Sequence, residues 1–211
     1  MQLFSNFLLD NLTYATSPRK KHKKRLAKPE DYQYLNCTSL DAPVMVYVAN
    51  SQASPELEAI KFAQVTHKNP GKLEEDYDDE FNWAFEKLIT DAGYEYDNQY
   101  FKVLMKEAAS ITIRLKYRFN RPRPFQLAYY LGVDIQEFNS STAKTPSFPS
   151  GHSAQSTLQA LVLADQFPDL KDKLIKIADK VSESRLVGGH HYPSDIEYGE
   201  QLGYWLHQNI K

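Results

Sequence analysis

The segment from Ser184 to Asp195 combines residue types that suit it to phosphate chemistry. Ser184 and Arg185 precede a Gly-Gly turn, and His191 follows that turn four residues before Asp195. A histidine that attacks phosphorus must be neutral, with the attacking nitrogen unprotonated and the other ring nitrogen held. A carboxylate such as Asp195 can hold that nitrogen and stabilise the cation formed on attack. The alternative, in which Asp195 caps the last helix while the histidines pack, explains less of the pattern.

A second candidate segment is Pro149-Ser150-Gly151-His152, which stands immediately before an amphipathic stretch. A small turn at this place leaves backbone N–H groups free at a helix N-terminus, and such groups bind anions. Gly151 allows close approach of the backbone, the Ser150 hydroxyl can donate, and His152 can carry a proton. Taken alone, the segment is equally typical of an ordinary helix cap built on Ser150 or Ser153.

A third segment is basic and ends in a proline-locked turn, with Lys116 seven residues before the Arg123-Pro124 pair. Lysine supplies a point charge, and arginine supplies a planar fork that matches phosphate oxygens. Alone, the segment reads as a basic helix C-terminus favoured by the helix dipole. Arg114 and Arg121 have the same spacing as Lys116 and Arg123, so two registers are open.

In order and spacing, the three segments together resemble the type 2 phosphatidic acid phosphatase superfamily, which also contains the vanadium haloperoxidases. Its signature is lysine, six residues, arginine-proline; proline-serine-glycine-histidine; and serine-arginine, five residues, histidine, three residues, aspartate. Every position is matched, by Lys116, Arg123, Pro124, Pro149, Ser150, Gly151, His152, Ser184, Arg185, His191 and Asp195. The family's lysine favours the Lys116 register, and His191 has both required spacings whereas its neighbour His190 does not. We therefore expect His190 at the rim of the site or behind it.

The resemblance implies a role for each matched residue. Phosphate oxygens would be held by Lys116, Arg123, Ser150, the Gly151 amide and Arg185. His191 would attack phosphorus and become a phosphohistidine, with Asp195 orienting it. His152 would protonate the leaving alkoxide and then activate water. Because positive side chains supply the electrostatics, neither a metal nor another cofactor is expected.

The soluble bacterial class A non-specific acid phosphatases are the members that the sequence resembles most. The alternative within the superfamily is a haloperoxidase that holds vanadate as cofactor in the same pocket, but those enzymes are typically much longer than 211 residues. In a phosphatase, vanadate would be an inhibitor. A metal phosphohydrolase is disfavoured because its usual His-Asp dipeptide is absent. The constellation suits small phosphomonoesters, nucleotides, sugar phosphates and diphosphates alike.

The elements that must position these segments read as helices. Apolar residues recur at helical spacing in most of the chain after residue 53, and strand-like alternation is confined to 43–49. The sequence predicts an all-α, single-domain helical bundle with the active site at helix ends. The expected helices cover residues 54–68, 73–92, 97–117, 152–167, 170–185 and 194–210.

Composition is that of an ordinary globular chain, with 42% hydrophobic residues, 25% charged residues and a net charge of −2. The single cysteine, Cys37, excludes an internal disulfide. No run approaches the roughly 20 apolar residues of a membrane-spanning helix, and no signal peptide is recognised, so a soluble, cytoplasmic protein is expected.

Residues 1–50 are predicted to be a partly flexible, basic extension, and residues 51–211 the phosphatase domain. Lysine and arginine are concentrated between Arg19 and Lys28. A solvated arm is the favoured interpretation. Contact with nucleic acid or an acidic membrane surface is the alternative, and the arm lacks the aromatic residues that would stack on bases. An adaptor protein that works through this arm with a degenerate site is disfavoured by the complete match at the catalytic positions.

Overall fold

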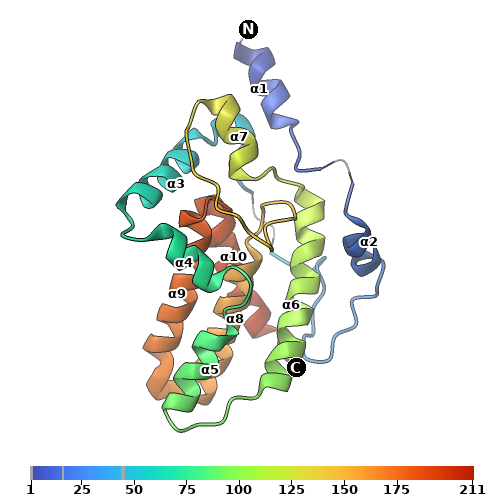
Figure 1. Ribbon diagram of the computed structural model, residues 1–211. Helices are drawn as coiled ribbons and strands as arrows, with labels where there is room; N and C mark the ends of the chain where they lie inside the picture. The colour runs from blue at the N-terminus through green and yellow to red at the C-terminus, as the bar shows by residue number, and fades with distance from the viewer. Residues whose placement is uncertain (1, 16, 44–45) are drawn as a thin grey trace.

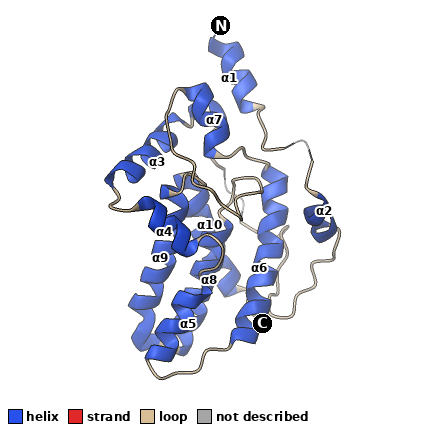
Figure 2. Cartoon of the chain, in the orientation of Figure 1, coloured by secondary structure: helices blue, strands red, loops and turns tan. Residues whose placement is uncertain are grey.

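The structure is a computed structural model that describes residues 2–15, 17–43 and 46–211. Figure 2 shows helices joined by loops, which confirms the predicted all-α class. In the described residues the one β-feature is an isolated bridge between Leu35 and Ile210. The α-helices are α1 Gln2–Asp10, α2 Lys20–Leu26, α3 Ser54–Thr66, α4 Pro70–Tyr77, α5 Asn82–Asp91, α6 Asn98–Phe119, α7 Pro124–Leu131, α8 Gly151–Gln166, α9 Lys171–Val187 and α10 Pro193–Gln208.

Helix α8 is the centre of the bundle and packs against α6, α9 and α10 (Figure 1). It is buried nearly all round, and many of its buried residues are alanine, serine and threonine. A helix without a polar face belongs inside a bundle, and small side chains allow its neighbours to come close. Gly199 and Gly203 of α10 use that space, since a Cβ on either glycine would lie within 2.7 Å of an α8 or Ser150 carbonyl oxygen.

Helix α6 carries one candidate site residue, Lys116, at its C-terminal end. The residues predicted to form its apolar face, Phe101, Leu104, Ala108, Ile111 and Leu115, are all buried. The helix ends where Asn120 takes a left-handed conformation with φ of 50°. The prolines that follow then exclude further helix and direct the chain into α7.

Two sequence predictions fail in the segment before α6. The single helix expected over 73–92 is divided into α4 and α5, and Asp78, the residue after α4, makes tertiary contacts. Its carbonyl oxygen is 2.9 Å from His152 Nε2, and its carboxylate accepts from Arg185. In α3, the helical spacing of the apolar residues predicts that they are buried, but Phe62 and Val65 are exposed.

The N-terminal residues contact the helical bundle at several points. Most lysines of α2 are exposed, as a solvated arm requires, but His22 is buried and α2 lies against α6. Both carboxylate oxygens of Glu107 accept backbone N–H groups, from Gln33 and Tyr34. Of the strand candidate at 43–49, positions 44–45 lie outside the described residues and the remainder forms no strand.

The three candidate segments meet at one end of the bundle. The end of α6, the start of α8 and the turn from α9 to α10 lie together there (Figure 1). Within the described ranges, no helix has the length and apolar character needed to span a bilayer.

Candidate active site

His191 lies between two side chains that fix its tautomer. Its Nδ1 is 3.2 Å from Asp195 Oδ2, and its Nε2 is 3.1 Å from Arg123 Nη1. A guanidinium nitrogen only donates, so Nε2 must be the unprotonated nitrogen and Nδ1 must carry the proton. Burial lowers the pKa of His191 well below its usual value, and Arg123 and Lys116 lower it further. The ring is therefore neutral, with a lone pair on Nε2.

The turn between α9 and α10 brings the members of this group together. Arg185 lies in the last turn of α9, Asp195 lies in the first turn of α10, and His191 lies between the two helices. Gly189 takes φ of +70°, and a Cβ there would come within 2.5 Å of the Gln136 carbonyl oxygen. Glycine meets both constraints, because it has no Cβ and adopts positive φ readily.

Asp195 is surrounded by donors. Its Oδ1 accepts from Arg121 Nη1 at 2.6 Å, and its Oδ2 accepts from the Tyr192 N–H at 3.0 Å, from the Ser147 hydroxyl and from His191 Nδ1. Burial alone would raise the pKa of Asp195, but Arg121, His191 and Ser147 together hold it well below its usual range. Asp195 is consequently an ionised, fully buried acceptor facing His191.

Arg121, which sequence reasoning did not assign to the site, holds Asp195 from behind. The guanidinium bridges Asp195 to Glu56 Oε2 at 2.6 Å. It lies between two aromatic rings, with Cζ 4.5 Å from the centre of the Tyr47 ring and 3.9 Å from that of Tyr192. Planar stacking of this kind is specific to arginine. The neighbouring Arg-Pro pairs were the available signal, but only the tertiary structure shows which pair does what.

The two possible registers of the basic segment differ clearly in position. Lys116 and Arg123 line the small cavity described next, and Arg114 and Arg121 do not. Arg114 instead pairs with Glu30, with Nε 3.4 Å from a carboxylate oxygen. The placement of these four side chains agrees with the register that the resemblance favours.

A small cavity of about 40 Å³ lies beside His191, which forms part of its wall. Of the eight predicted site residues, Ser150 and Asp195 do not line it and six do: Lys116, Arg123, Gly151, His152, Arg185 and His191. Thr142, Ala143 and Thr145 complete the wall. A cavity of this size accepts a group of a few heavy atoms and not a whole sugar or nucleoside.

Three buried cations surround the cavity, and each is held by oxygen atoms. Lys116 Nζ donates to the carbonyl oxygens of Pro146 and Ser147, both at 2.9 Å. Arg123 Nε donates to the Thr145 carbonyl oxygen at 2.8 Å. Burial lowers the pKa of Lys116 well below its usual value and that of Arg123 to about 10. An anion in the cavity would raise both pKa values again, because it stabilises the charged forms of the two side chains.

Arg185 completes the set and keeps one donor unused. Its Nη2 donates to Asp78 Oδ1 at 2.8 Å. Its Nε is buried and has no hydrogen-bond partner in the part of the chain that the structure describes. An unpaired buried donor is costly, and an oxyanion in the adjoining cavity would satisfy it.

His152 lies opposite, in the first turn of α8. Its Nε2 is 2.9 Å from the Asp78 carbonyl oxygen, which only accepts, so Nε2 carries the proton. Burial, followed by the charge of Arg185, lowers the pKa of His152 well below its usual value. The lowered pKa favours the neutral form of His152, and a bound dianion would favour its protonation at Nδ1.

Ser150 is placed behind the cavity and not in its wall. Its side chain is fully buried, and its Oγ accepts from the Ser153 N–H at 3.3 Å and from the Ser153 hydroxyl at 2.9 Å. Ser150 thus serves as the N-cap of α8, the role that the sequence offered as its ordinary alternative.

His190 also faces away from the cavity and is buried behind it. Its Nε2 is 2.8 Å from Glu74 Oε1, and its carbonyl oxygen accepts from Arg123 Nη1 at 2.7 Å. Burial lowers the pKa of His190 to about 2 and raises that of Glu74 to about 7, the latter helped by Asp78. The contact with Glu74 holds His190 in place, and with it the backbone carbonyl that accepts from Arg123.

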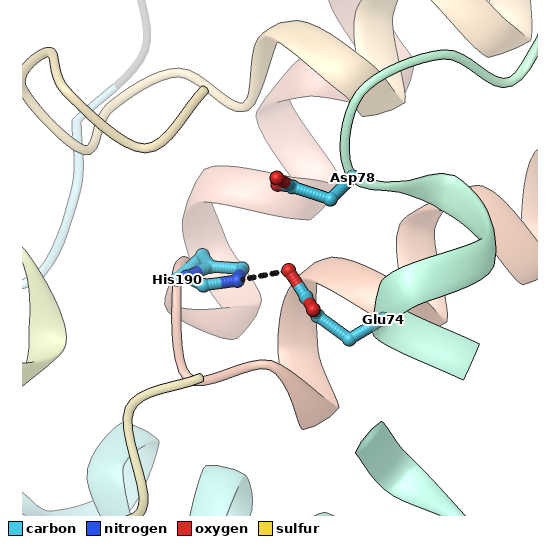
Figure 3. Close-up of side chains that lie close together, drawn as sticks. All are labelled: Glu74, Asp78 and His190. Carbon is cyan, nitrogen blue, oxygen red and sulfur yellow. Dashed lines mark hydrogen bonds and ion pairs between the residues drawn. The ribbon is translucent and has the colours of Figure 1, made fainter. Parts of the chain in front are cut away.

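Glu74, Asp78 and His190 converge from α4 and the α9–α10 turn, as Figure 3 shows. Their potential ligand atoms lie within 4.8 Å of one another, which is close enough for a metal ion. Arg185 already supplies positive charge there, with Nη2 2.8 Å from Asp78 and 3.9 Å from Glu74. A metal ion would have to displace this arginine, so the cluster fits an ion-pair network better than a metal site.

Comparison with known proteins agrees with this geometry. The family profile described as the PAP2 superfamily matches residues 101–208, which include every predicted site residue. A non-specific acid phosphatase of Providencia stuartii is 29% identical over 118 residues, which are 56% of this chain and 47% of the relative. A non-specific acid phosphatase of Salmonella typhi is 35% identical over 92 residues, which are 44% of this chain and 36% of the relative. The chain thus spans half or less of the length of these relatives.

Two solved structures share the fold. One is a transmembrane PAP2-type phosphatidylglycerolphosphate phosphatase from Bacillus subtilis, with a TM-score of 0.54, 20% identity, and coverage of 75% of this chain and 84% of the other. The second is a bacterial vanadium-dependent iodoperoxidase, with a TM-score of 0.59, 19% identity, and coverage of 80% and 51%. At such identities the likeness concerns the fold alone.

Proposed function

The chain belongs to the PAP2 superfamily, and on that premise we propose that it hydrolyses phosphate esters through a phosphohistidine at His191. The observation that carries the proposal is the tautomer of His191. Its Nε2 carries the lone pair, and His191 lines the small cavity together with Lys116, Arg123 and Arg185. A neutral nucleophile surrounded by cations is suited to a phosphoryl group, which arrives with negative charge on its oxygens.

In the first step, His191 Nε2 attacks phosphorus and the bond between phosphorus and the ester oxygen breaks. Arg123 Nη1 then donates to a phosphate oxygen in place of Nε2, and Asp195 stabilises the imidazolium that forms. His152, protonated while the dianion is bound, gives its proton to the departing alkoxide. Buried donors held in advance at the positions of the phosphoryl oxygens lower the barrier without reorganisation.

In the second step, neutral His152 takes a proton from water, and the hydroxide attacks the phosphohistidine. The nitrogen–phosphorus bond breaks, His191 returns to its neutral tautomer, and inorganic phosphate leaves. The positive side chains perform the charge stabilisation that metal ions perform in other phosphatases. We therefore expect hydrolysis to continue in the presence of EDTA.

Vanadate resembles the transferring phosphoryl group and would occupy the same cavity. One of the structures with this fold is a vanadium-dependent iodoperoxidase, so haloperoxidase activity is the second candidate. The curated relatives are named acid phosphatases, which favours hydrolysis. We expect vanadate to inhibit the protein, and we expect no useful halogenation with vanadate, peroxide and bromide. Sustained bromination faster than phosphate release would reverse this order.

The mechanism is tested by separating the two histidines. An aryl phosphate with an acidic phenol hardly needs protonation, so His152→Ala should still form the intermediate and accumulate it, while steady-state turnover falls by about 10²–10⁴-fold. His191→Ala should form no intermediate. A mild quench followed by rapid mass spectrometry would detect about 80 Da added at His191, the mass of one phosphoryl group.

The matched control is His207→Ala, which removes a histidine that is also paired with an aspartate but lies at the surface, 2.7 Å from Asp165. It should leave turnover unchanged. Label on His152 or His190, or normal turnover by His191→Ala, would show that the nucleophile is misassigned. Activity that EDTA abolishes and zinc or magnesium restores would refute the metal-independent mechanism.

A further inference from the structure

A second, larger cavity of about 390 Å³ adjoins the phosphate cavity. Lys116, Gly151 and His152 belong to the walls of both. Cavities of a few hundred Å³ are typical of small-molecule sites. On the proposed function, on which this inference rests, the inner cavity takes the phosphoryl group. The remainder of the substrate must then lie in the outer cavity.

One wall of the outer cavity comes from α2, which lies outside the region matched by the family profile. His22 and Arg25 line it. His22 Nδ1 is 2.8 Å from the Tyr117 hydroxyl, and Arg25 Nη2 donates to the Lys106 carbonyl oxygen at 3.2 Å. Arg114 donates to the carbonyl oxygen of Lys28 and so holds the end of α2. The basic residues between Arg19 and Lys28 therefore include part of a cavity wall, formed by α2 where it packs against α6.

The floor of the outer cavity is apolar. Met105, Ala109 and Ile113 follow one another at intervals of four residues along α6, and Phe81 closes the opposite side. Such a surface accommodates the carbon skeleton of a leaving group and carries no charge of its own.

Apart from Lys116, which lies next to the small cavity, the charged groups of this cavity come from two elements. Arg25 lies on the α2 side, and in the described part of the chain it forms no ion pair and donates only to a neutral carbonyl. Asp79 and Glu80 lie on the side of the α4–α5 loop. An anionic group on a substrate is therefore repelled from the loop side and attracted to the α2 side.

We propose that Arg25 forms a subsite for a second anionic group of the substrate. The preferred substrates are then phosphate esters whose leaving group itself carries a carboxylate or a further phosphate. His22, neutral when buried beside the arginine and lysine residues of α2, supports the same wall through Tyr117.

The test compares pairs of substrates that differ in one terminal group. Phosphorylated sugar acids of three, four and six carbons are matched with the phosphorylated polyols of the same length, in which a hydroxymethyl group replaces the carboxylate. The three lengths place the carboxylate at three distances from phosphorus. The wild-type protein should show a higher kcat/KM for the acid than for the polyol at one or more lengths.

Arg25→Ala should lower kcat/KM for the preferred acid by about tenfold, the low end for a hydrogen bond to a charged group, because Arg25 is partly solvated. The value for the matched polyol should change by less than about twofold, since it makes no ionic contact with this side chain. Arg25→Lys should retain part of the preference. The control is Lys24→Ala, which removes an exposed charge from the same helix outside the cavity and should alter neither substrate.

An equal loss for acid and polyol in Arg25→Ala would show that Arg25 only holds α2 in place, and it would overturn the subsite while leaving the proposed function intact. The absence of any acid preference in the wild type would do the same. If no ester is hydrolysed, the proposed function fails, and calorimetric binding to His191→Ala decides the subsite separately. The His191→Ala protein should bind the acid more tightly than the polyol, and adding Arg25→Ala to it should remove the difference. Equal binding of acid and polyol to the His191→Ala protein would overturn the subsite.

Discussion

The Asp195→Asn variant tests the hydrogen-bond network behind the nucleophile. The four groups that contact Asp195, from Arg121, Ser147, His191 and Tyr192, are all placed as donors. An asparagine presents one acceptor and one donor, so its amide must face at least one of these donors whichever way it turns. In either orientation Arg121 loses the charge of Asp195; the amide nitrogen then faces either Arg121 or His191, and in the second case His191 loses the acceptor that holds its proton on Nδ1.

The variant should lower both the stability of the protein and its kcat. Breaking a buried ion pair usually destabilises a protein by about 3–5 kcal/mol, and the lower end applies here because Arg121 keeps Glu56 at 2.6 Å. A protein of ordinary stability, about 5–15 kcal/mol, stays folded after a loss of about 3 kcal/mol. In hydrolase triads, loss of the carboxylate that fixes the histidine tautomer lowers kcat by about 10⁴-fold. We therefore expect a fall of roughly 10³–10⁴-fold in kcat in a folded variant.

The assay combines kcat for an aryl phosphate with urea unfolding and circular dichroism. The control is Asp165→Asn at the exposed pair with His207, which should change neither quantity. The folded-state pKa of Asp195 is depressed, so its contribution is present at neutral pH and lost as pH falls from about 4 through the folded pKa. The variant should lack that acid-dependent loss. A folded Asp195→Asn protein with kcat within tenfold of wild type would refute the tautomer argument.

Two further predictions concern residues behind the site. Gly199→Ala puts a Cβ 2.6 Å from the Ser150 carbonyl oxygen, and Gly203→Ala puts one 2.7 Å from that of Ala154. Each variant should lose about 1–3 kcal/mol of stability by overpacking. Only Gly199→Ala should also raise the inhibition constant of inorganic phosphate. If the two variants have the same inhibition constant, the Ser150 turn has no role in phosphate binding. Burial raises the pKa of Glu74 from 4.5 to about 7, so the folded state binds its proton more tightly and stability should fall as pH rises across that window. Glu74→Gln should remove this slope, worth up to about 3 kcal/mol, in urea titrations at pH 5 and pH 8; an unchanged slope would contradict it.

The sequence by itself determined the helical class, and it predicted most of the residues that the structure brings together around the small cavity. Helical periodicity identifies α6 because its apolar face is formed by residues close together along the chain. Lys116, Arg123, His152 and His191 were identified by their residue types and by the order and spacing that resemble the superfamily signature, and each lies at or beside a helix end. These are properties of short segments, which one sequence contains in full.

The tertiary structure decided what each of these residues contacts. Asp78 lies where the helix expected over 73–92 is interrupted. Its partners, His152 and Arg185, are more than 70 residues away in sequence, so the local sequence does not indicate this break. Arg121 and Arg123 belong to neighbouring Arg-Pro pairs, and the spacing from Lys116 favoured Arg123 for the phosphate site, but only the structure shows that Arg121 contacts Asp195. The position of α2 as a wall of the outer cavity was likewise decided by packing against α6. Contacts between residues distant in sequence depend on how the helices pack, and no local pattern records that.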